Sequence, residues 1–195
     1  MITSTEFINA AEIGNIDIIR TALDDSEFDP CVTDEGRNTA LIAAARSGHT
    51  KVVTELLGDK RIDPNTSNAY GFTALIAAAE SGHTEVVKGL LGCRSIDVNI
   101  ADGFGNTALM SAANYARIEV VRVLLKDGRI DPNGINRFGN TALIDAAESG
   151  HVKLVKELIG DVRTDPNATN DFGQTALTAA AWRGHADVVR ELVKD

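Results

Sequence analysis

The apolar residues of this chain recur at a fixed interval of 34 residues. Each interval holds a Thr-Ala-Leu triplet or its equivalent, a run of small residues, and then a pair of branched apolar residues followed by another apolar pair. Because several independent positions keep the same interval, the pattern indicates internal repetition. The triplets begin at Thr39, Thr73, Thr107, Thr141 and Thr175, and the branched pairs are Val52-Val53, Val86-Val87, Val120-Val121, Leu154-Val155 and Val188-Val189.

Each repeat is predicted to form two short helices. Leu41 and Ala45 have the i, i+4 spacing of one helical face. Thr39 suits the N-cap of this helix, because its hydroxyl can accept a hydrogen bond from an early backbone N–H group. Gly48 is expected to end the helix in the left-handed conformation, which costs glycine least. A second helix with a two-residue-wide apolar stripe is predicted to start near Thr50.

The interval divides the chain into six units, of which the first is degenerate. Thr5 lies one interval before Thr39 but is followed by Glu-Phe-Ile instead of Ala-Leu-Ile. The segments between units are rich in Pro, Asn and Gly, which predicts turns that project away from the helices. One helix pair exposes both of its flat sides, so neighbouring units must bury them. We therefore expect an all-α solenoid, a single domain over 1–195, with units at about 1–34, 35–68, 69–102, 103–136, 137–170 and 171–195.

The composition agrees with thin helices and argues against a nucleic-acid partner. Apolar residues make up 44% of the chain and aromatic residues only 5%, which favours closely packed, alanine-rich helices. The net charge is −9, from 28 acidic and 19 basic residues. Without a run of Lys and Arg, this charge repels phosphate backbones.

Cysteine usage and hydropathy bear on the compartment. Cys31 and Cys93 lie far apart in the sequence, and the chain shows neither an N-terminal apolar signal segment nor a stretch long enough to span a bilayer. We therefore expect a cytoplasmic protein of a reducing compartment, without membrane insertion. We also expect a monomer.

The repeated pattern resembles the ankyrin repeat over essentially the whole chain. The residues that carry the resemblance are Thr-Ala-Leu-Ile-x-Ala-Ala-x-Ser-Gly-His-x-x-Val-Val-x-x-Leu-Leu, followed by Ile-Asp-Pro-Asn and a Gly-bearing turn. Ala stands where that family usually has Pro after Thr, and Ile, Met or Thr where it usually has His after Leu. The period is also one residue longer than the common one, and the extra residue falls around Gly58–Arg61. The resemblance implies stacked helix-turn-helix units and a protein-binding role.

No residues suggest an enzyme, a cofactor or a metal site. His49, His83, His151 and His185 each follow the Gly that ends a first helix. Stacked units place them about 10 Å apart, whereas the ligands of one metal ion lie about 2 Å from it, so a structural role in the turn is favoured. Nucleophile elbows, phosphate-binding glycine loops and Cys-x-x-Cys pairs are absent from the sequence.

The resemblance also implies where a partner binds, namely on the tips of the inter-unit turns and the exposed side of the first helices. The residues expected to contact a partner are Arg46, Tyr70, Phe72, Glu80, Asp102, Phe104, Asn114, Tyr115, Arg137, Phe138, Asp145, Glu148, Asp171, Phe172, Trp182 and Arg183. The same face further includes Glu12, Ile13, Asp34, Glu35, Asn38, Asn68, Ala69, Asn106 and Asn136.

Aromatic and acidic residues gather on this predicted face. It carries seven of the nine aromatic residues of the chain, and eight acidic against three basic residues. Exposed aromatics surrounded by charge favour a protein or peptide partner, and the negative charge favours a basic one. The other interpretation is structural, because Tyr70, Phe104, Phe138 and Phe172 share one position before a Gly and could pack turn against turn.

The fourth unit departs from the pattern at the end of its first helix. Asn-Tyr-Ala-Arg over 114–117 replaces Glu-Ser-Gly-His, so Ala116 occupies the helix-ending Gly position. A left-handed Ala costs about 1–2 kcal/mol, which suggests a functional reason, although neutral drift is the alternative. We expect Tyr115 at the centre of the binding groove. A second hypothesis for the whole chain is a targeting or regulatory domain of a larger enzyme or effector.

Overall fold

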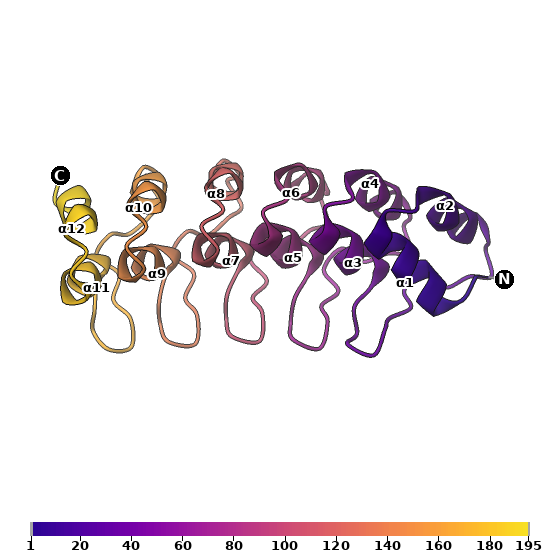
Figure 1. The fold of residues 1–195 in the computed structure, drawn as a ribbon, viewed down its shortest axis with the longest axis horizontal. Helices are drawn as coiled ribbons and strands as arrows, with labels where there is room; N and C mark the ends of the chain where they lie inside the picture. Colours follow the sequence, from indigo (N-terminus) through magenta and orange to yellow (C-terminus); the bar gives the residue numbers. More distant parts are fainter. Residues whose placement is uncertain (1, 195) are drawn as a thin grey trace.

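The computed structural model describes residues 2–194 as twelve helices arranged in six stacked pairs (Figure 1). The first helices of the pairs form one row, the second helices form another, and the inter-unit loops project from the opposite side of the first row (Figure 1). The first-row helices are α1 (Ser4–Ile13), α3 (Ala40–Ser47), α5 (Ala74–Ser81), α7 (Ala108–Asn114), α9 (Ala142–Glu148) and α11 (Ala176–Arg183). The second-row helices are α2 (Ile16–Asp24), α4 (Thr50–Gly58), α6 (Thr84–Leu91), α8 (Ile118–Leu125), α10 (Val152–Ile159) and α12 (Ala186–Leu192).

The predicted all-α solenoid is confirmed. Two isolated bridges, Thr33 with Thr39 and Ala101 with Thr107, are the only β-type pairings among residues 2–194. None of the helices described is both long enough and apolar enough to cross a membrane.

The predicted caps bound the first-row helices. The Thr39 hydroxyl oxygen accepts a hydrogen bond from the Ile42 N–H group at 3.2 Å, and Gly48 ends α3 with φ of +81°. The first unit differs from the prediction. Its helix α1 begins at Ser4, two residues before the start that Thr5 as N-cap would give, because Thr3 and Glu6 form a capping box.

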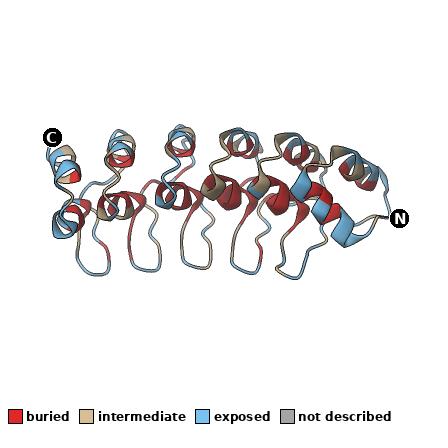
Figure 2. Cartoon of the chain, in the orientation of Figure 1, coloured by how far each residue is buried: buried red, intermediate tan, exposed pale blue. Residues whose placement is uncertain are grey.

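The core is continuous along the stack, because successive first-row helices bury their apolar residues against each other (Figure 2). In α3, all residues from Ala40 to Ala45 are buried, and α5 repeats this from Ala74 to Ala79. Alanine lets adjacent helices approach closely, while Val52 and Leu56 of α4 close the space between the two rows. Units at the ends have one partner fewer, and Leu177 of α11 is 37% exposed, whereas Leu41 at the equivalent position is 2% exposed.

A ladder of asparagine side chains fixes the register between successive loops. The Asn65 Nδ2 atom donates to the Ser95 carbonyl oxygen at 2.9 Å, and its Oδ1 atom accepts from the Asp97 N–H group at 2.7 Å. Asn99 and Asn133 make the equivalent pairs of bonds to the units that follow them. Each amide thus satisfies two backbone groups of the next unit.

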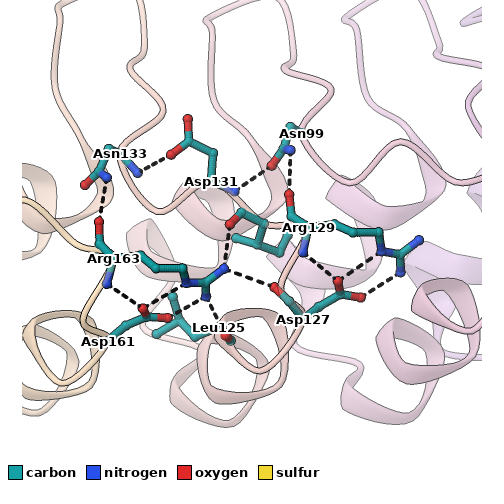
Figure 3. Close-up of polar contacts among 9 residues, drawn as sticks. Asn99, Leu125, Asp127, Arg129, Asp131, Asn133, Asp161 and Arg163 are labelled. Carbon is teal, nitrogen blue, oxygen red and sulfur yellow. Dashed lines mark hydrogen bonds and ion pairs between the residues drawn. The ribbon is translucent and has the colours of Figure 1, made fainter.

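Arginine residues clamp the ends of the second-row helices α2, α6 and α8 to the units that follow them (Figure 3). Arg163 pairs with Asp161 at 2.5 Å, and its Nη2 atom also donates to the Leu125 carbonyl oxygen at 2.6 Å. The pairing holds the pKa of Asp161 below its usual value. The guanidinium therefore satisfies a carbonyl group that the end of α8 leaves open. Arg129 and Arg61 make the same clamp onto α6 and α2.

The clamp is missing between the second and third units, where Ser95 and Cys93 stand in place of Arg and Asp. The Cys93 sulfur lies 3.2 Å from the Ser95 hydroxyl oxygen, and this short pair does not reach α4. This segment is equivalent to Gly58–Arg61, where the period has its extra residue.

We predict that the double substitution Cys93→Asp and Ser95→Arg stabilises the array by about 1 kcal/mol, because the new guanidinium reaches the open end of α4. Urea unfolding followed by circular dichroism measures the change. The reverse exchange, Asp127→Cys with Arg129→Ser, should lower the free energy of unfolding by a similar amount. Equal stability of all three proteins would contradict the role given to the clamp.

Candidate functional site

Each loop tip is organised by one Asn or Asp side chain. The Asn136 Oδ1 atom accepts from the Phe138 N–H group at 3.0 Å and from the Asn140 N–H group at 3.1 Å. Gly139 between them has a φ of +71°, which favours glycine. Asn68, Asp102 and Asn170 build the same turn in their own loops.

The turns of these four loops each hold one aromatic ring outward, whereas the first loop has Gly36 at the equivalent position. The exposed fractions are 68% for Tyr70, 59% for Phe104, 58% for Phe138 and 74% for Phe172. Neighbouring loops are joined by backbone hydrogen bonds and not by contacts between these rings. One such bond runs from the Arg137 N–H group to the Phe104 carbonyl oxygen at 3.0 Å. Packing of turn against turn therefore does not account for the rings.

A groove runs between the loop tips and the first-row helices in the fourth to sixth units. It encloses about 520 Å³. We call it the loop groove, and its lining residues are Phe104, Asn106, Asn114, Asn136, Phe138, Asn140, Asp145, Glu148, Ser149, Asn170, Phe172 and Gln174. The lining has three aromatic rings, two carboxylates and many amides, but neither Lys nor Arg.

Asp145 occupies the floor of the loop groove, on the first turn of α9. Its Oδ1 atom accepts from Asn140 Nδ2 at 2.7 Å and its Oδ2 atom from Asn136 Nδ2 at 3.3 Å. Burial raises the pKa of Asp145 to about 6, while the bond from Asn140 opposes the rise and the charge of Glu148 adds to it. The groove thus keeps a partly desolvated carboxylate.

An amide row connects the loops along the groove. Asn170 Nδ2 donates to Asn140 Oδ1 at 2.8 Å, and Asn136 Nδ2 donates to Asn106 Oδ1 at 3.4 Å. Asn140, Asn170 and Gln174 were not expected among the contact residues. Their signal in the sequence is weak, because polar residues in turns are common.

The other predicted contact residues lie outside the loop groove. Phe72 is half-buried against the core. Arg46 is exposed, with its guanidinium 3.3 Å from Asn38 Oδ1. Arg183 lies 4.9 Å from the centre of the exposed Trp182 ring and pairs with Glu148. The positions outside the lining are Arg46, Tyr70, Phe72, Glu80, Asp102, Tyr115, Arg137, Asp171, Trp182 and Arg183.

Tyr115, which was expected at the centre of the binding groove, is not among the residues that line the loop groove. Tyr115 follows α7 as its C-cap residue, and its neighbour Asn114 lines the groove instead. A hydrogen bond with Glu80 and the charge of that carboxylate raise the pKa of the Tyr115 phenol. Tyr115 is thus influenced by Glu80 of the preceding unit, whereas Asp145 lines the loop groove.

Three of the four histidines link successive units, in agreement with the predicted structural role. The Nε2 atoms of His49, His83 and His185 lie 2.8–2.9 Å from carbonyl oxygens of the preceding unit. Each ring packs on a Gly, and a Cβ on Gly48 would lie 2.6 Å from the His83 ring. In the fourth unit the Nε atom of Arg117 makes this link, to the Glu80 carbonyl oxygen at 2.9 Å.

Ala116 adopts the left-handed conformation, with a φ of +52°. In other units a Gly without a Cβ atom stands at this position, and the histidine ring of the next unit packs on it. The Cβ atom of Ala116 occupies that space. Of the residues at this position in the second to sixth units, His151 alone makes no hydrogen bond to a carbonyl oxygen of the preceding unit within residues 2–194. The substitution thus both strains the backbone and removes a link between units.

Comparison with known proteins identifies the repeat. The family model for ankyrin repeats in three copies matches residues 7–102 and 95–170, and the single ankyrin repeat model matches 172–195. The chain belongs to the ankyrin repeat family. Ankyrin repeats are generally protein–protein interaction modules and typically non-catalytic, and the matched repeats cover nearly the whole chain. A comparison with curated proteins gave no match.

Two solved ankyrin structures illustrate the similarity. The crystal structure of EF0377, an ankyrin repeat protein, is 26% identical with a TM-score of 0.90, over 100% of this chain and 99% of that one. The ankyrin repeat domain of Bcl-3, described as a unique member of the IkappaB family, is also 26% identical with a TM-score of 0.90, over 96% of this chain and 84% of that one. This ankyrin array holds no group of three or more potential metal ligands among residues 2–194.

We predict that Asp145→Asn stabilises the ankyrin array at pH 8 by about 2 kcal/mol. A raised carboxyl pKa means that the folded state binds its proton more tightly. The wild-type stability contributed by Asp145 is thus fully present below about pH 4 and lost as the pH rises through 6. Urea unfolding at both pH values measures the difference between the variants. It should shrink toward zero at pH 4, and a difference that is the same at both values would contradict the desolvation argument.

Proposed function

We propose that this ankyrin array binds a protein or peptide segment in the loop groove of its fourth to sixth units. The observation that carries the proposal is the set of outward rings, Phe104, Phe138 and Phe172, held over a groove whose only charges are carboxylates. Exposed aromatic residues are enriched where proteins bind each other, since they bury much area at little entropic cost. The amide row beside them offers donors and acceptors for a partner's backbone.

Rigid placement of the rings supports this proposal. Loop tips fixed by Asx turns, and by backbone bonds such as Asp171 N–H to Phe138 carbonyl oxygen at 3.2 Å, lose little freedom on binding. Preorganisation reduces the entropic cost of association. The negative groove favours a basic partner, whose affinity should fall as salt rises.

We predict that the double variant Phe104→Ala/Phe138→Ala lowers the affinity for the partner at least about tenfold, because both rings would be buried in the complex. Proteins captured from a lysate by the wild-type array are quantified against those captured by the variant. Thermal unfolding checks that the exposed substitutions leave the fold intact.

The matched control is Ile135→Ala/Val162→Ala. It removes two apolar side chains that are 61% and 99% exposed and lie outside the loop groove. The control should retain every partner that the groove variant loses. Equal capture by all three proteins, or a loss with the control alone, would refute binding in the loop groove.

A further inference from the structure

Asp145 is the single carboxylate in its row of the stack. The equivalent positions hold Asn9, Ala43, Ala77, Ser111 and Ala179, none of which is charged. This position lies on the first helix of each unit. Only in α9 does it hold a charged residue, and that residue lines the loop groove. Since Ala serves at this position elsewhere in the array, packing does not require a carboxylate in the fifth unit.

Asp145 has polar partners but no counter-ion. Two asparagine amides donate to its oxygens, and a carboxylate with about four acceptor positions keeps room for further donors. Within residues 2–194, no Lys, Arg or His forms an ion pair with it. Glu148, one turn further along α9, is by contrast already paired with Arg183.

The surroundings of Asp145 suit a cationic side chain. The groove of about 520 Å³ has the size of a site that can accept a long side chain. Phe104 and Phe138 stand at its rim with more than half of each ring exposed. The face of an aromatic ring attracts an ammonium or guanidinium group, most strongly where water is displaced.

We propose that the Asp145 carboxylate forms a cation subsite, which takes one lysine or arginine side chain of the bound partner between the rims made by Phe104 and Phe138. This inference rests on the proposed function of the loop groove and names the chemistry that the groove recognises. The cation supplies the charge that Asp145 lacks and donates hydrogen bonds to its free acceptor positions. It also accounts for a carboxylate that the fold alone would not need.

The subsite makes binding depend on pH through Asp145. The charged group that acts on Asp145 from its own helix is Glu148. The loop before α9 contributes only the neutral side chains of Asn136 and Asn140. From the neighbouring unit, the guanidinium of Arg183 is held by Glu148. As the pH falls below 6, free Asp145 takes up a proton and the cation loses its partner.

Random twelve-residue peptides displayed on phage test the proposal without a known partner. They are selected in parallel on the full-length wild-type chain, on Asp145→Asn and on Glu85→Gln. The last variant removes the same charge from α6, in the second row of helices and away from the groove. Peptides from the wild type and from Glu85→Gln should be enriched in Lys or Arg at one shared position, and peptides from Asp145→Asn should lack that enrichment. The enriched residue shows whether an ammonium or a guanidinium is preferred.

Affinity at two pH values gives a readout that a purely structural role would not change. A wild-type-selected peptide should bind the wild-type chain about tenfold more weakly at pH 5 than at pH 7, since one pH unit below the pKa leaves about a tenth of the carboxylates ionised. Binding to Asp145→Asn should be weaker at pH 7 and independent of pH over this range.

The outcomes separate the subsite from the groove. Peptides that need Phe104 and Phe138 but show no basic enrichment, or that bind Asp145→Asn equally well, would overturn the cation subsite and leave the groove intact. If no selected peptide depends on the two rings, both the proposed function and the subsite are wrong.

Discussion

Burial of each unit against its neighbours is the constraint on which the rest of this structure depends. A helix pair of this size exposes two apolar sides, and ordering each residue costs about 1–2 kcal/mol of backbone entropy. The alanine-rich first-row helices lose their exposed area only when another such helix lies on either side. The partial exposure of Leu177 in the last unit shows how the same residue type behaves when one neighbour is missing.

Polar contacts then determine the register of this apolar stack. Asn65 and its equivalents join loop to loop, the arginine clamps join helix ends to the next unit, and histidines join the turns. Interruptions are local, such as Ser95 in the clamp row and Ala116 in the glycine row. The result is a rigid series of loop tips, and the loop groove is formed where three of them carry Phe.

The fold could be predicted from the sequence because its causes are local and repeated. Thr39 as a cap and Gly48 as a helix end follow from short-range chemistry, and the interval of 34 residues repeats them. The site was less predictable. The sequence places Asp145 on the binding face but cannot show that it is desolvated and unpaired, since this depends on the groove formed with adjacent loops. Tyr115 was expected at the centre because it breaks the pattern, yet it is not among the residues that line the loop groove.

The unfolding of fragments with increasing numbers of units tests the central claim most directly. Chains that end at residues 102, 136, 170 and 195 are compared by urea denaturation, together with residues 69–102 alone. If neighbour burial stabilises the fold, circular dichroism shows that the single unit is unfolded. The free energy of unfolding of the longer chains then rises with each added unit. A helical, cooperatively unfolding single unit, or equal stability of all four longer chains, would contradict the account.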